Sequence, residues 1–486
     1  MHEQTDIVLV HPGNKKLTYQ ELGESFSAIE PPIWCSIIAS DLRTKGIDVH
    51  IIDANAENLS PTEVANRIND IQPILAGIVV TGVHPSASTQ TMPSAIKISH
   101  AIKSKCNIPL VVSGLHPTAL PQQTLKETHA DYIIEGHGLV SFAELLFYLK
   151  DSSKTIETIP GLWFYLSPNN ISFTFKSPLL SSFPSPSWDL LPMSLYQAHN
   201  WQCLSNMSHR SPYASLYTSI GCPHHCKFCC VHTFWQNHKV IYRPTDEVIA
   251  DIDYLVNKYQ IKYLKIADEN FLLNPNHYMP IINQLMLKNY HINIWIYSRI
   301  DTIRQEHLPL LRKAGIQWIA LGIESADASV LNAVDKPIQQ QNMINCVNTI
   351  KSHDICVMGN YVFGLPNDCL ESLQATLDIA KTLNCEFVNF NCMMPYPGTI
   401  YYEKAIQAGT APPIWEAYSQ HAYETQPLPT SSLGASDILE FRDQAFHAYF
   451  SRPSYLMMIE KKFGMDARYH IEKMIKTRLK RKLIGH

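Results

Sequence analysis

Short apolar runs alternate with amphipathic stretches along the first 150 residues of the chain. The runs are apolar throughout, as strands buried on both faces of a parallel sheet are. They predict strands at residues 6–10, 49–53, 75–80, 110–113 and 132–135. The intervening stretches predict helices at residues 34–45, 61–71, 92–105, 121–128 and 141–149. Five such units favour an α/β domain with a doubly wound, flavodoxin-like (Rossmann-type) sheet.

A second series of alternating strands and helices runs from residue 211 to about residue 400. Its predicted strands are residues 216–219, 263–267, 293–297, 318–322, 356–363 and 387–392. Helices are predicted between them, for example at residues 245–259 and 340–353. Six units are too few to close an eight-fold barrel, and they favour a partial, open (β/α)6 TIM-like barrel.

The remaining segments lack this alternation. Residues 151–210 contain polar and Pro/Ser-rich stretches and predict a linker with one small hairpin, at residues 162–165 and 171–175. Residues 401–486 are mostly helical and end in a basic tail at 473–482. We interpret this tail as a solvated terminal face; an amphipathic helix that contacts a membrane or an acidic partner is the alternative. The predicted segments are therefore 1–150, 151–210, 211–400 and 401–486.

The composition is that of a globular protein. Of 486 residues, 45% are hydrophobic and 17% are charged, and the net charge of −4 gives no reason to expect a nucleic-acid partner. Residues 1–20 contain no basic segment followed by a long apolar core, so no signal peptide is predicted. No apolar run is long enough to span a bilayer. Twelve cysteines without an export signal predict a reducing, cytoplasmic location, where thiols bind metals or pack in cores.

Three of these cysteines lie close together in the segment Cys222-Pro-His-His-Cys226-Lys-Phe-Cys229. Three thiolates bind three irons of a four-iron cluster and leave the fourth iron open, whereas a structural cluster has a fourth cysteine. An open position is typical of a reactive metal, as in catalytic zinc sites. The spacing alone leaves two alternatives open: buried thiols, or a zinc site completed by nearby histidines. Those histidines are His224, His225 and His232.

Loops rich in glycine and small residues follow most strands of the first series. They are Pro12-Gly13, Thr81-Gly82-Val83-His84, Gly114-Leu-His116-Pro-Thr118 and Gly136-His137-Gly138. Ligands of such sheets lie at the carboxyl ends of the strands. Glycines there allow a large planar or phosphate-bearing cofactor to approach the backbone closely.

Several motifs, in this order, resemble those of the B12 (cobalamin)-binding radical S-adenosylmethionine (SAM) enzymes. The resemblance covers about residues 5–400. In the first region it rests on the loops at 114–118 and 135–138, and in the second on the three-cysteine loop. Four further motifs follow: Ile-Ala-Asp268-Glu269-Asn-Phe, Leu-Gly-Ile-Glu324-Ser, Val-Phe-Gly364-Leu-Pro and Pro395-Tyr-Pro-Gly-Thr.

The resemblance implies positions for three cofactors. The [4Fe-4S] cluster would be bound by Cys222, Cys226 and Cys229. The implied SAM-binding residues are Asp268 and Glu269 for the amino group, Ser298 and Arg299 for the carboxylate, Glu324 for the ribose, and Gly359, Tyr361 and Met393 for the adenine. The implied cobalamin-binding residues are Pro12, Thr81, Gly82, Gly114, His116, Gly136 and Gly138.

Simpler roles stay open for several of these residues. Asp268 and Glu324 are alternatively helix caps, Arg299 an ion-pair partner of Asp301 or Glu324, and His116 a core or loop histidine. The loop after the first strand lacks the D-x-H-x-x-G pattern of other B12 proteins, so no histidine is expected to replace the lower base of the cofactor.

The implied activity is methyl transfer to an unactivated carbon or phosphorus of a small-molecule substrate. One SAM would methylate the cobalt, and a second would supply a 5′-deoxyadenosyl radical, with electrons from an external flavodoxin or ferredoxin. A radical rearrangement or oxidative cyclisation is the alternative among enzymes. A B12 sensor or an iron–sulfur scaffold is the alternative outside them. Four aromatic side chains are candidates for a substrate pocket, although packing is the simpler interpretation: Trp201, Phe234, Trp235 and Tyr297.

Overall fold

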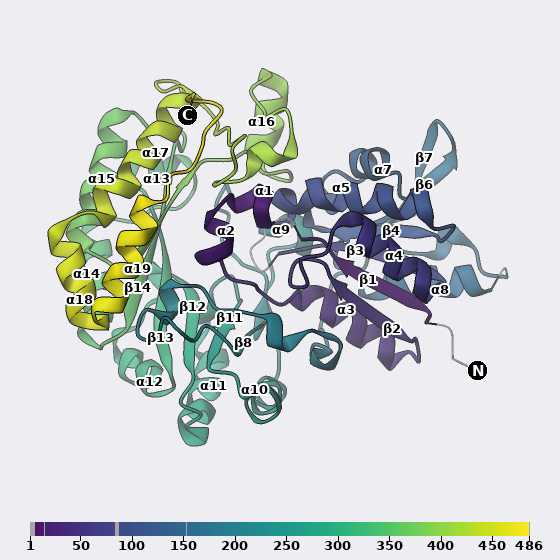
Figure 1. Ribbon diagram of the computed structural model, residues 1–486, viewed down its shortest axis with the longest axis horizontal. Coiled ribbons are helices and arrows are strands. Elements are labelled where there is room, and N and C mark those ends of the chain that lie inside the picture. The colour runs from purple at the N-terminus through teal and green to yellow at the C-terminus, as the bar shows by residue number, and fades with distance from the viewer. Residues whose placement is uncertain (1–4, 14, 83–86, 152, 486) are drawn as a thin grey trace.

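A computed structural model describes residues 5–13, 15–82, 87–151 and 153–485. Two largely parallel sheets flanked by helices lie side by side in it (Figure 1). The sheet near the N-terminus occupies the right of the figure, and the second sheet, with the C-terminal helices outside it, occupies the left.

The first sheet begins with five parallel strands in the order β2-β1-β3-β4-β5, which is the flavodoxin-like order. The strands are β1 (Ile7–His11), β2 (Val49–Asp53), β3 (Leu75–Val80), β4 (Leu110–Gly114) and β5 (Tyr132–Ile134). Their bounds confirm the predicted strands to within one residue, and three of them, β1, β3 and β4, are buried along their whole length.

Helices cover both faces of this sheet. Alternate side chains of β1 point to opposite faces: Ile7 and Leu9 pack toward α3 and α8, whereas Val8 and Val10 pack toward α4 and α5. The longer helices are α3 (Ile33–Thr44), α4 (Pro61–Ile71), α5 (Ala87–Lys105), α7 (Pro121–Thr128) and α8 (Leu139–Lys150). Three short helices, α1 (Lys15–Tyr19), α2 (Leu22–Ser25) and α6 (Leu115–Ala119), lie in the connections.

The predicted hairpin is present as β6 (Leu162–Ser167) and β7 (Asn170–Phe173). It pairs antiparallel with β5, where Ile134 lies opposite Leu162, so the first sheet has seven strands. The sheet therefore extends beyond residue 150, where the sequence pattern changes.

The second sheet has six parallel strands in the order β15-β14-β13-β12-β11-β8. They are β8 (Tyr213–Leu216), β11 (Tyr263–Ile266), β12 (Asn293–Arg299), β13 (Ile316–Glu324), β14 (Cys356–Phe363) and β15 (Phe387–Cys392). The prediction of a first strand at 216–219 is wrong, because β8 ends at Leu216, where it pairs with Ile266. The chain turns at Tyr217 and forms a small hairpin of β9 (Ser219–Ile220) and β10 (Ile241–Tyr242).

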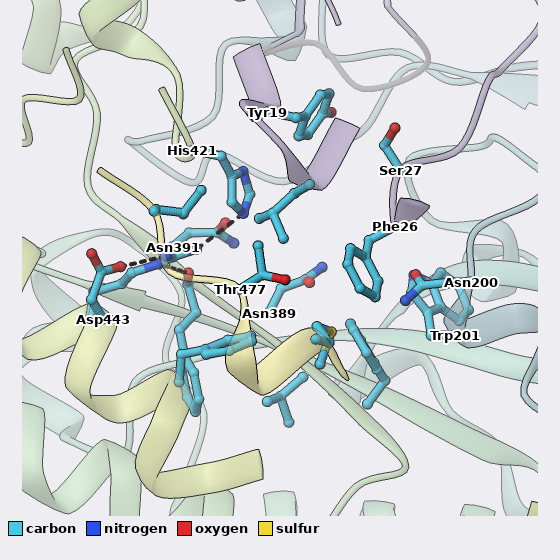
Figure 2. A pocket seen from close by; sticks show the side chains of 18 of the residues that line it. Tyr19, Phe26, Ser27, Asn200, Trp201, Asn389, Asn391, His421, Asp443 and Thr477 are labelled. Atoms are coloured by element: carbon cyan, nitrogen blue, oxygen red, sulfur yellow. Dashed lines mark hydrogen bonds and ion pairs between the residues drawn. The ribbon is translucent and has the colours of Figure 1, made fainter. Parts of the chain in front are cut away.

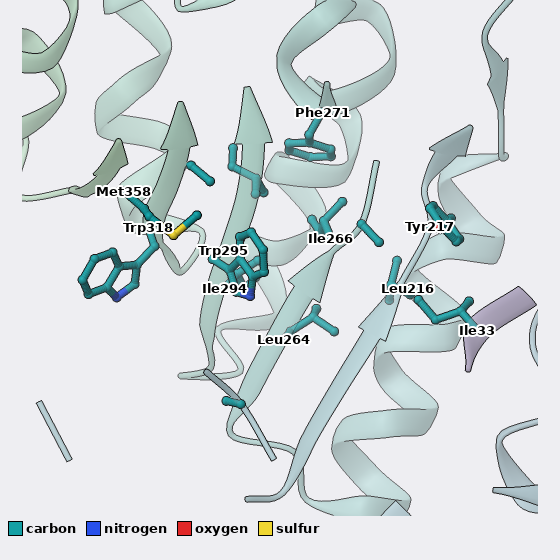
Figure 3. Packing of buried hydrophobic residues seen from close by; sticks show 14 of the residues in the cluster. Ile33, Leu216, Tyr217, Leu264, Ile266, Phe271, Ile294, Trp295, Trp318 and Met358 are labelled. Carbon is teal, nitrogen blue, oxygen red and sulfur yellow. The ribbon is translucent and has the colours of Figure 1, made fainter. Parts of the chain in front are cut away.

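Tryptophans fill part of the interior beside this sheet. Trp295 of β12 and Trp318 of β13 lie on neighbouring strands (Figure 3). Trp201, from the segment before β8, packs edge-on against both, with ring centroids 5.0 and 5.1 Å away. The helices of this half are α9 (Val231–Trp235), α10 (Thr245–Tyr259), α11 (Pro275–Lys288), α12 (Leu308–Lys313), α13 (Ala328–Ala333), α14 (Gln340–Ser352), α15 (Leu370–Leu383) and α16 (Ile400–Ala408).

The C-terminal region packs against the second sheet. Its helices are α17 (Ala435–Phe450), α18 (Pro453–Phe463) and α19 (Met465–Lys476), which lie beside α14 and α15 in Figure 1. No helix in the described part of the chain is long and apolar enough to cross a membrane.

The basic tail is anchored within the fold, so its interpretation as a solvated face is wrong for Arg481. This side chain is fully buried. It forms an ion pair with Asp443 at 2.9 Å and donates to the carbonyls of Gln420 and Ala422. Nearby, the Gln20 amide bonds to both backbone groups of Lys480, which joins the tail to the N-terminal region.

We expect Arg481→Ala to lower the free energy of unfolding by about 2 to 4 kcal/mol, because it leaves buried acceptors unpaired. Urea denaturation followed by tryptophan fluorescence measures this, and trypsin should cleave the tail faster. Lys480→Ala is the matched control, since the Lys480 side chain is exposed. Equal stability of the two variants would contradict the anchoring role.

Candidate active site

The three cysteines lie in the loop between β9 and α9, and all three are half-buried. Gly221 begins this loop with φ +92°, and a Cβ there would lie 2.3 Å from the Lys239 carbonyl oxygen. The Cys229 amide donates to the Cys226 carbonyl at 3.0 Å. The loop thus has a defined turn that presents its thiols together.

Arg299, at the end of β12, lies beside the cysteine loop. Its Nη1 donates to the Cys226 Sγ at 3.4 Å, while Nε and Nη2 form a two-pronged ion pair with Asp301 at 2.9 and 2.8 Å. Arg299 therefore forms the ion pair with Asp301 that the sequence left open as its simpler role. The guanidinium thus places a positive charge beside the sulfur of Cys226.

The donor set of the loop fits an iron–sulfur cluster. In the described residues, no group of three His, Cys, Asp or Glu side chains is arranged to hold one metal ion. Thiolates around a four-iron cube bind separate irons, so they need not converge on one point. His232, a candidate zinc ligand, has its ring nitrogens 2.7 and 3.3 Å from the carbonyl oxygens of His224 and Asn237. Cys230 is buried and packs in the core.

Asp268 and Glu269, which follow β11, hold the start of this loop. Asp268 is fully buried and accepts from the Thr218 amide and hydroxyl at 2.7 and 2.6 Å and from the Ser219 hydroxyl at 2.6 Å. Glu269 accepts from the Trp235 indole at 2.8 Å and from the Gly221 amide at 3.0 Å. Burial raises the pKa of Glu269 to about 7. Contact of either carboxyl with SAM stays a prediction.

Glu324 at the end of β13 occupies a strained position. Its φ is +65°, at an irregularity in the pairing of β13 with β14. Its carboxylate forms a buried ion pair with Lys336 at 2.5 Å. A Cβ at Gly322 would lie 2.5 Å from both charged groups, so only glycine leaves room for the pair. Strain of this kind is typical of functional sites. Sequence reasoning missed Lys336, which no motif marks.

The other implied SAM residues differ in what they offer. Ser298 is buried and shares hydrogen bonds with Thr302 and Asn270. The Tyr361 ring is fully buried against Phe390, so the side chain belongs to the core. Three of the predicted positions therefore present mainly backbone or apolar surface, and their contact with SAM stays a prediction. These are Gly359, where a Cβ would lie 2.9 Å from the Tyr361 ring, Tyr361 itself, and Met393, which packs in an apolar cluster beside Phe228 of the cysteine loop.

The implied cobalamin residues gather at one edge of the first sheet, at the carboxyl ends of its strands. They are Pro12 after β1, Thr81 and Gly82 after β3, Gly114 at the end of β4, His116 in α6, and Gly136 and Gly138 after β5. Val83 and His84 of the second loop lie outside the described residues. Gly114 has φ +140°, and a Cβ there would lie 2.1 Å from the Val80 oxygen. Only glycine fits at this position, because the backbone of β3 occupies the space that a side chain would need.

His116 has one ring nitrogen available. The ring is fully buried, its Nδ1 lies 3.2 Å from the Thr89 hydroxyl, and its Nε2 has no hydrogen-bond partner among the described residues. Burial lowers the pKa of His116 to about 3, so the imidazole is neutral. Trp415 of the C-terminal region packs edge-on against it at 4.4 Å. A neutral, unpartnered nitrogen beside glycine loops fits the donor set of a cobalamin site.

This edge of the first sheet faces the cysteine loop of the second. Gln236, just after α9, donates to Glu135 at 3.0 Å, and the Trp34 indole donates to the His137 carbonyl at 2.9 Å. Trp34 also packs edge-on against Trp235, with centroids 4.9 Å apart.

A cavity of about 30 Å³ lies between these faces. Four aromatic side chains line this cavity: Trp34, Tyr217, Phe234 and Trp235.

Comparison with known families agrees with the division of the chain into two α/β domains. The radical SAM superfamily model matches residues 216–380, and the B12 binding domain model matches residues 21–146. The chain belongs to the B12-binding radical SAM proteins. The radical SAM domain carries the cysteine loop, and the B12-binding domain carries the glycine-loop edge that faces it.

Relatives of this B12-binding radical SAM protein span most of its length. An uncharacterized methyltransferase of Pyrococcus horikoshii is 29% identical over 82% of this chain and 83% of its own. The anaerobic magnesium-protoporphyrin IX monomethyl ester cyclase of Rubrivivax gelatinosus is 22% identical, over 93% of this chain and 78% of its own. The structure of the radical S-adenosylmethionine methyltransferase TsrM from Kitasatospora setae superposes with a TM-score of 0.68 at 16% identity, covering 93% of this chain and 90% of TsrM, which shows a shared fold.

The hydrogen-bond network of Asp268 predicts acid sensitivity. His277 Nε2 lies 3.0 Å from the Thr218 hydroxyl, and burial lowers the pKa of His277 from 6.5 to about 4. Between these pH values the unfolded chain binds a proton that the folded chain does not, so stability is complete above pH 6.5 and falls as the pH drops toward 4. The free energy of unfolding that this residue loses is about 1 kcal/mol at pH 5.5.

His277→Gln should remove that part of the loss of stability, measured by urea titrations at pH 7.5 and 5.5. His209→Gln, at an exposed position, should not. Identical pH dependence in both variants would refute the assignment.

Proposed function

We propose that this chain is a radical SAM methyltransferase that acts on an unactivated carbon or phosphorus of a small molecule, with a [4Fe-4S] cluster, SAM and cobalamin as cofactors. The single observation that carries the proposal is the apposition of two edges: the cysteine loop of one parallel sheet faces the glycine-loop edge of the other. Chemistry at the cluster and chemistry at the corrinoid would therefore meet in one interface.

In this proposal the residues of the chain bind the cofactors, orient them and shield them from water. Cys222, Cys226 and Cys229 would hold the cluster and leave one iron open for SAM. Arg299 supports an anionic ligand beside Cys226, and the strained Glu324 presents its carboxylate at the end of β13. Aromatic side chains at the interface exclude water. When bound, the cluster supplies the electron that cleaves SAM, and cobalamin carries the methyl group. An external flavodoxin- or ferredoxin-type donor in a reducing cytoplasm completes the proposal.

Oxidative cyclisation is the second candidate. It is favoured by the similarity, over 93% of this chain, to the Rubrivivax gelatinosus protein, whose name describes a cyclase. The same residues would bind the same cofactors in both cases, so the fate of the methyl group distinguishes the two reactions.

We expect Cys226→Ala to abolish SAM cleavage, because the cluster loses one of three ligands. Anaerobic reconstitution, iron quantitation and chromatographic detection of 5′-deoxyadenosine measure this. Cys230→Ala removes the adjacent but buried thiol and should retain cluster iron and cleavage. Cleavage by the Cys226 variant at the rate of the unmodified protein would refute the assignment of the loop.

Labelled SAM separates methyl transfer from cyclisation. The reconstituted enzyme is incubated with trideuteromethyl SAM, a reductant, cobalamin and a metabolite extract. Methyl transfer predicts a product that carries the deuterated methyl group, formed together with 5′-deoxyadenosine. Deoxyadenosine with a dehydrogenated, unlabelled product would instead favour the cyclase.

A further inference from the structure

A cavity of about 680 Å³ lies inside the open barrel (Figure 2). One side is formed by β12, β14 and β15, and another by α17, α19 and the tail. A third is formed by residues 19–30 of the B12-binding domain, which supply Tyr19, Phe26 and Glu30. None of the implied cofactor-binding residues lines it, so it is a separate space from the small gap described above.

The cavity lies along the strand that leads to the cluster. Trp295 and Tyr297 of β12 both line it. Side chains two residues apart point to the same face of a strand, so Arg299 is next along that face. Arg299 contacts Cys226. A molecule in the cavity would therefore be placed next to the cofactor-binding end of the barrel.

Three acidic side chains line the cavity, Glu30, Glu440 and Asp443, and the charge of Glu30 is neutralised by a buried cation. Glu30 accepts from Lys265 and from the Tyr213 hydroxyl, each at 2.9 Å. Burial acts to raise the pKa of Glu30, but the Lys265 ammonium and His199 hold it well below its usual range. Glu30 is therefore ionised and already paired with a buried cation.

The basic groups are engaged as well. Arg442 donates to the Phe390 carbonyl at 2.8 Å, to Asp443 at 2.6 Å and to His421 at 3.1 Å. Burial and the neighbouring Arg442 lower the pKa of His421 well below its usual range, so this ring is neutral. The other lining cation, Arg478, is exposed to solvent. Within the described lining, the buried cation Arg442 is thus already engaged.

Two amides on β15 supply neutral polar contacts. Asn389 donates to Asn360 at 3.1 Å. Asn391 makes no side-chain hydrogen bond to any described residue, and Figure 2 shows it at the cavity beside His421. Rings form much of the surrounding wall: Tyr19, Phe26, Trp201, Trp295, Tyr297 and Phe390.

We infer that this cavity binds the substrate, and that the substrate is an uncharged, ring-bearing small molecule with a hydrogen-bonding group that meets Asn391. The volume falls within the range of about 300–1,000 Å³ that is typical of small-molecule pockets. Because the buried charges of the lining already pair with other residues, an anionic ligand would lose its hydration there without gaining a buried partner, which favours an uncharged ligand. The inference rests on the proposed function, since it takes the bound molecule to be the methyl acceptor.

The test compares two probes with the same ring framework. N-phenyl-1-naphthylamine is neutral, and 1-anilinonaphthalene-8-sulfonate carries a sulfonate. Each is equilibrated by dialysis against the full chain reconstituted with iron, sulfide and cobalamin, and the bound probe is quantified by chromatography. We expect one equivalent of the neutral probe to bind at least tenfold more tightly than the sulfonate. Equal binding of the two probes would overturn the inference.

Two substitutions of Asn391 test whether the probes bind in this cavity. Asn391→Phe fills the cavity and should weaken binding of the neutral probe at least tenfold. Asn391→Lys adds a cation and should reverse the preference toward the sulfonate, a gain that a misfolded chain would not show. Gln374→Phe and Gln374→Lys, on the exposed face of α15, are the matched controls. Asn391 variants that bind both probes as the Gln374 variants do would overturn the inference.

The two proposals fail separately. Selective binding of the neutral probe without transfer of the deuterated methyl group would support the cavity and remove the methyltransferase assignment. Methyl transfer in a protein that binds the two probes equally would support the methyltransferase assignment and overturn the inference about the cavity.

Discussion

An ion pair between the half-buried Glu30 and the buried Lys265 joins the two halves of the molecule. Glu30 belongs to the B12-binding domain, and Lys265 lies on β11 of the radical SAM domain, with its ammonium above the rings of Trp295 and Tyr297. Either charge alone would be costly in this interior. The pair therefore requires the N-terminal segment to lie inside the open side of the barrel, and this position sets the shape and charge of the large cavity.

The same placement aligns the edges where parallel strands end. A parallel sheet presents its loops, and hence its ligands, at the carboxyl ends of its strands. With the two domains held together, the glycine loops of one sheet face the cysteine loop of the other, and Trp34 and Trp235 pack between them. Asp268, Glu269 and Lys336 then act as supports, since each bonds to a group that shapes the loop or a strand end.

Local pattern predicted most strands, and the failures have physical causes. The strand β3 matches its predicted bounds because an apolar run buried on both faces has few alternatives. The first barrel strand was misplaced because the apolar run continues past the turn at Tyr217, where hydrogen bonds from Thr218 to Asp268 end the strand. The tail was misjudged because its lysines and arginines look alike in sequence, whereas Arg481 meets Asp443, a residue that only the folded chain brings near.

The sequence by itself determined the two α/β domains and the candidate cofactor residues, because strand periodicity and the spacing of cysteines and glycines are local properties of the chain. The tertiary structure alone decided that the carboxylates of Asp268, Glu269 and Glu324 are engaged by other side chains. It also decided the cavity, whose walls come from the N-terminal segment, the barrel strands and the tail. Pairing of charges and enclosure of space depend on contacts between residues distant in sequence, which periodicity does not record.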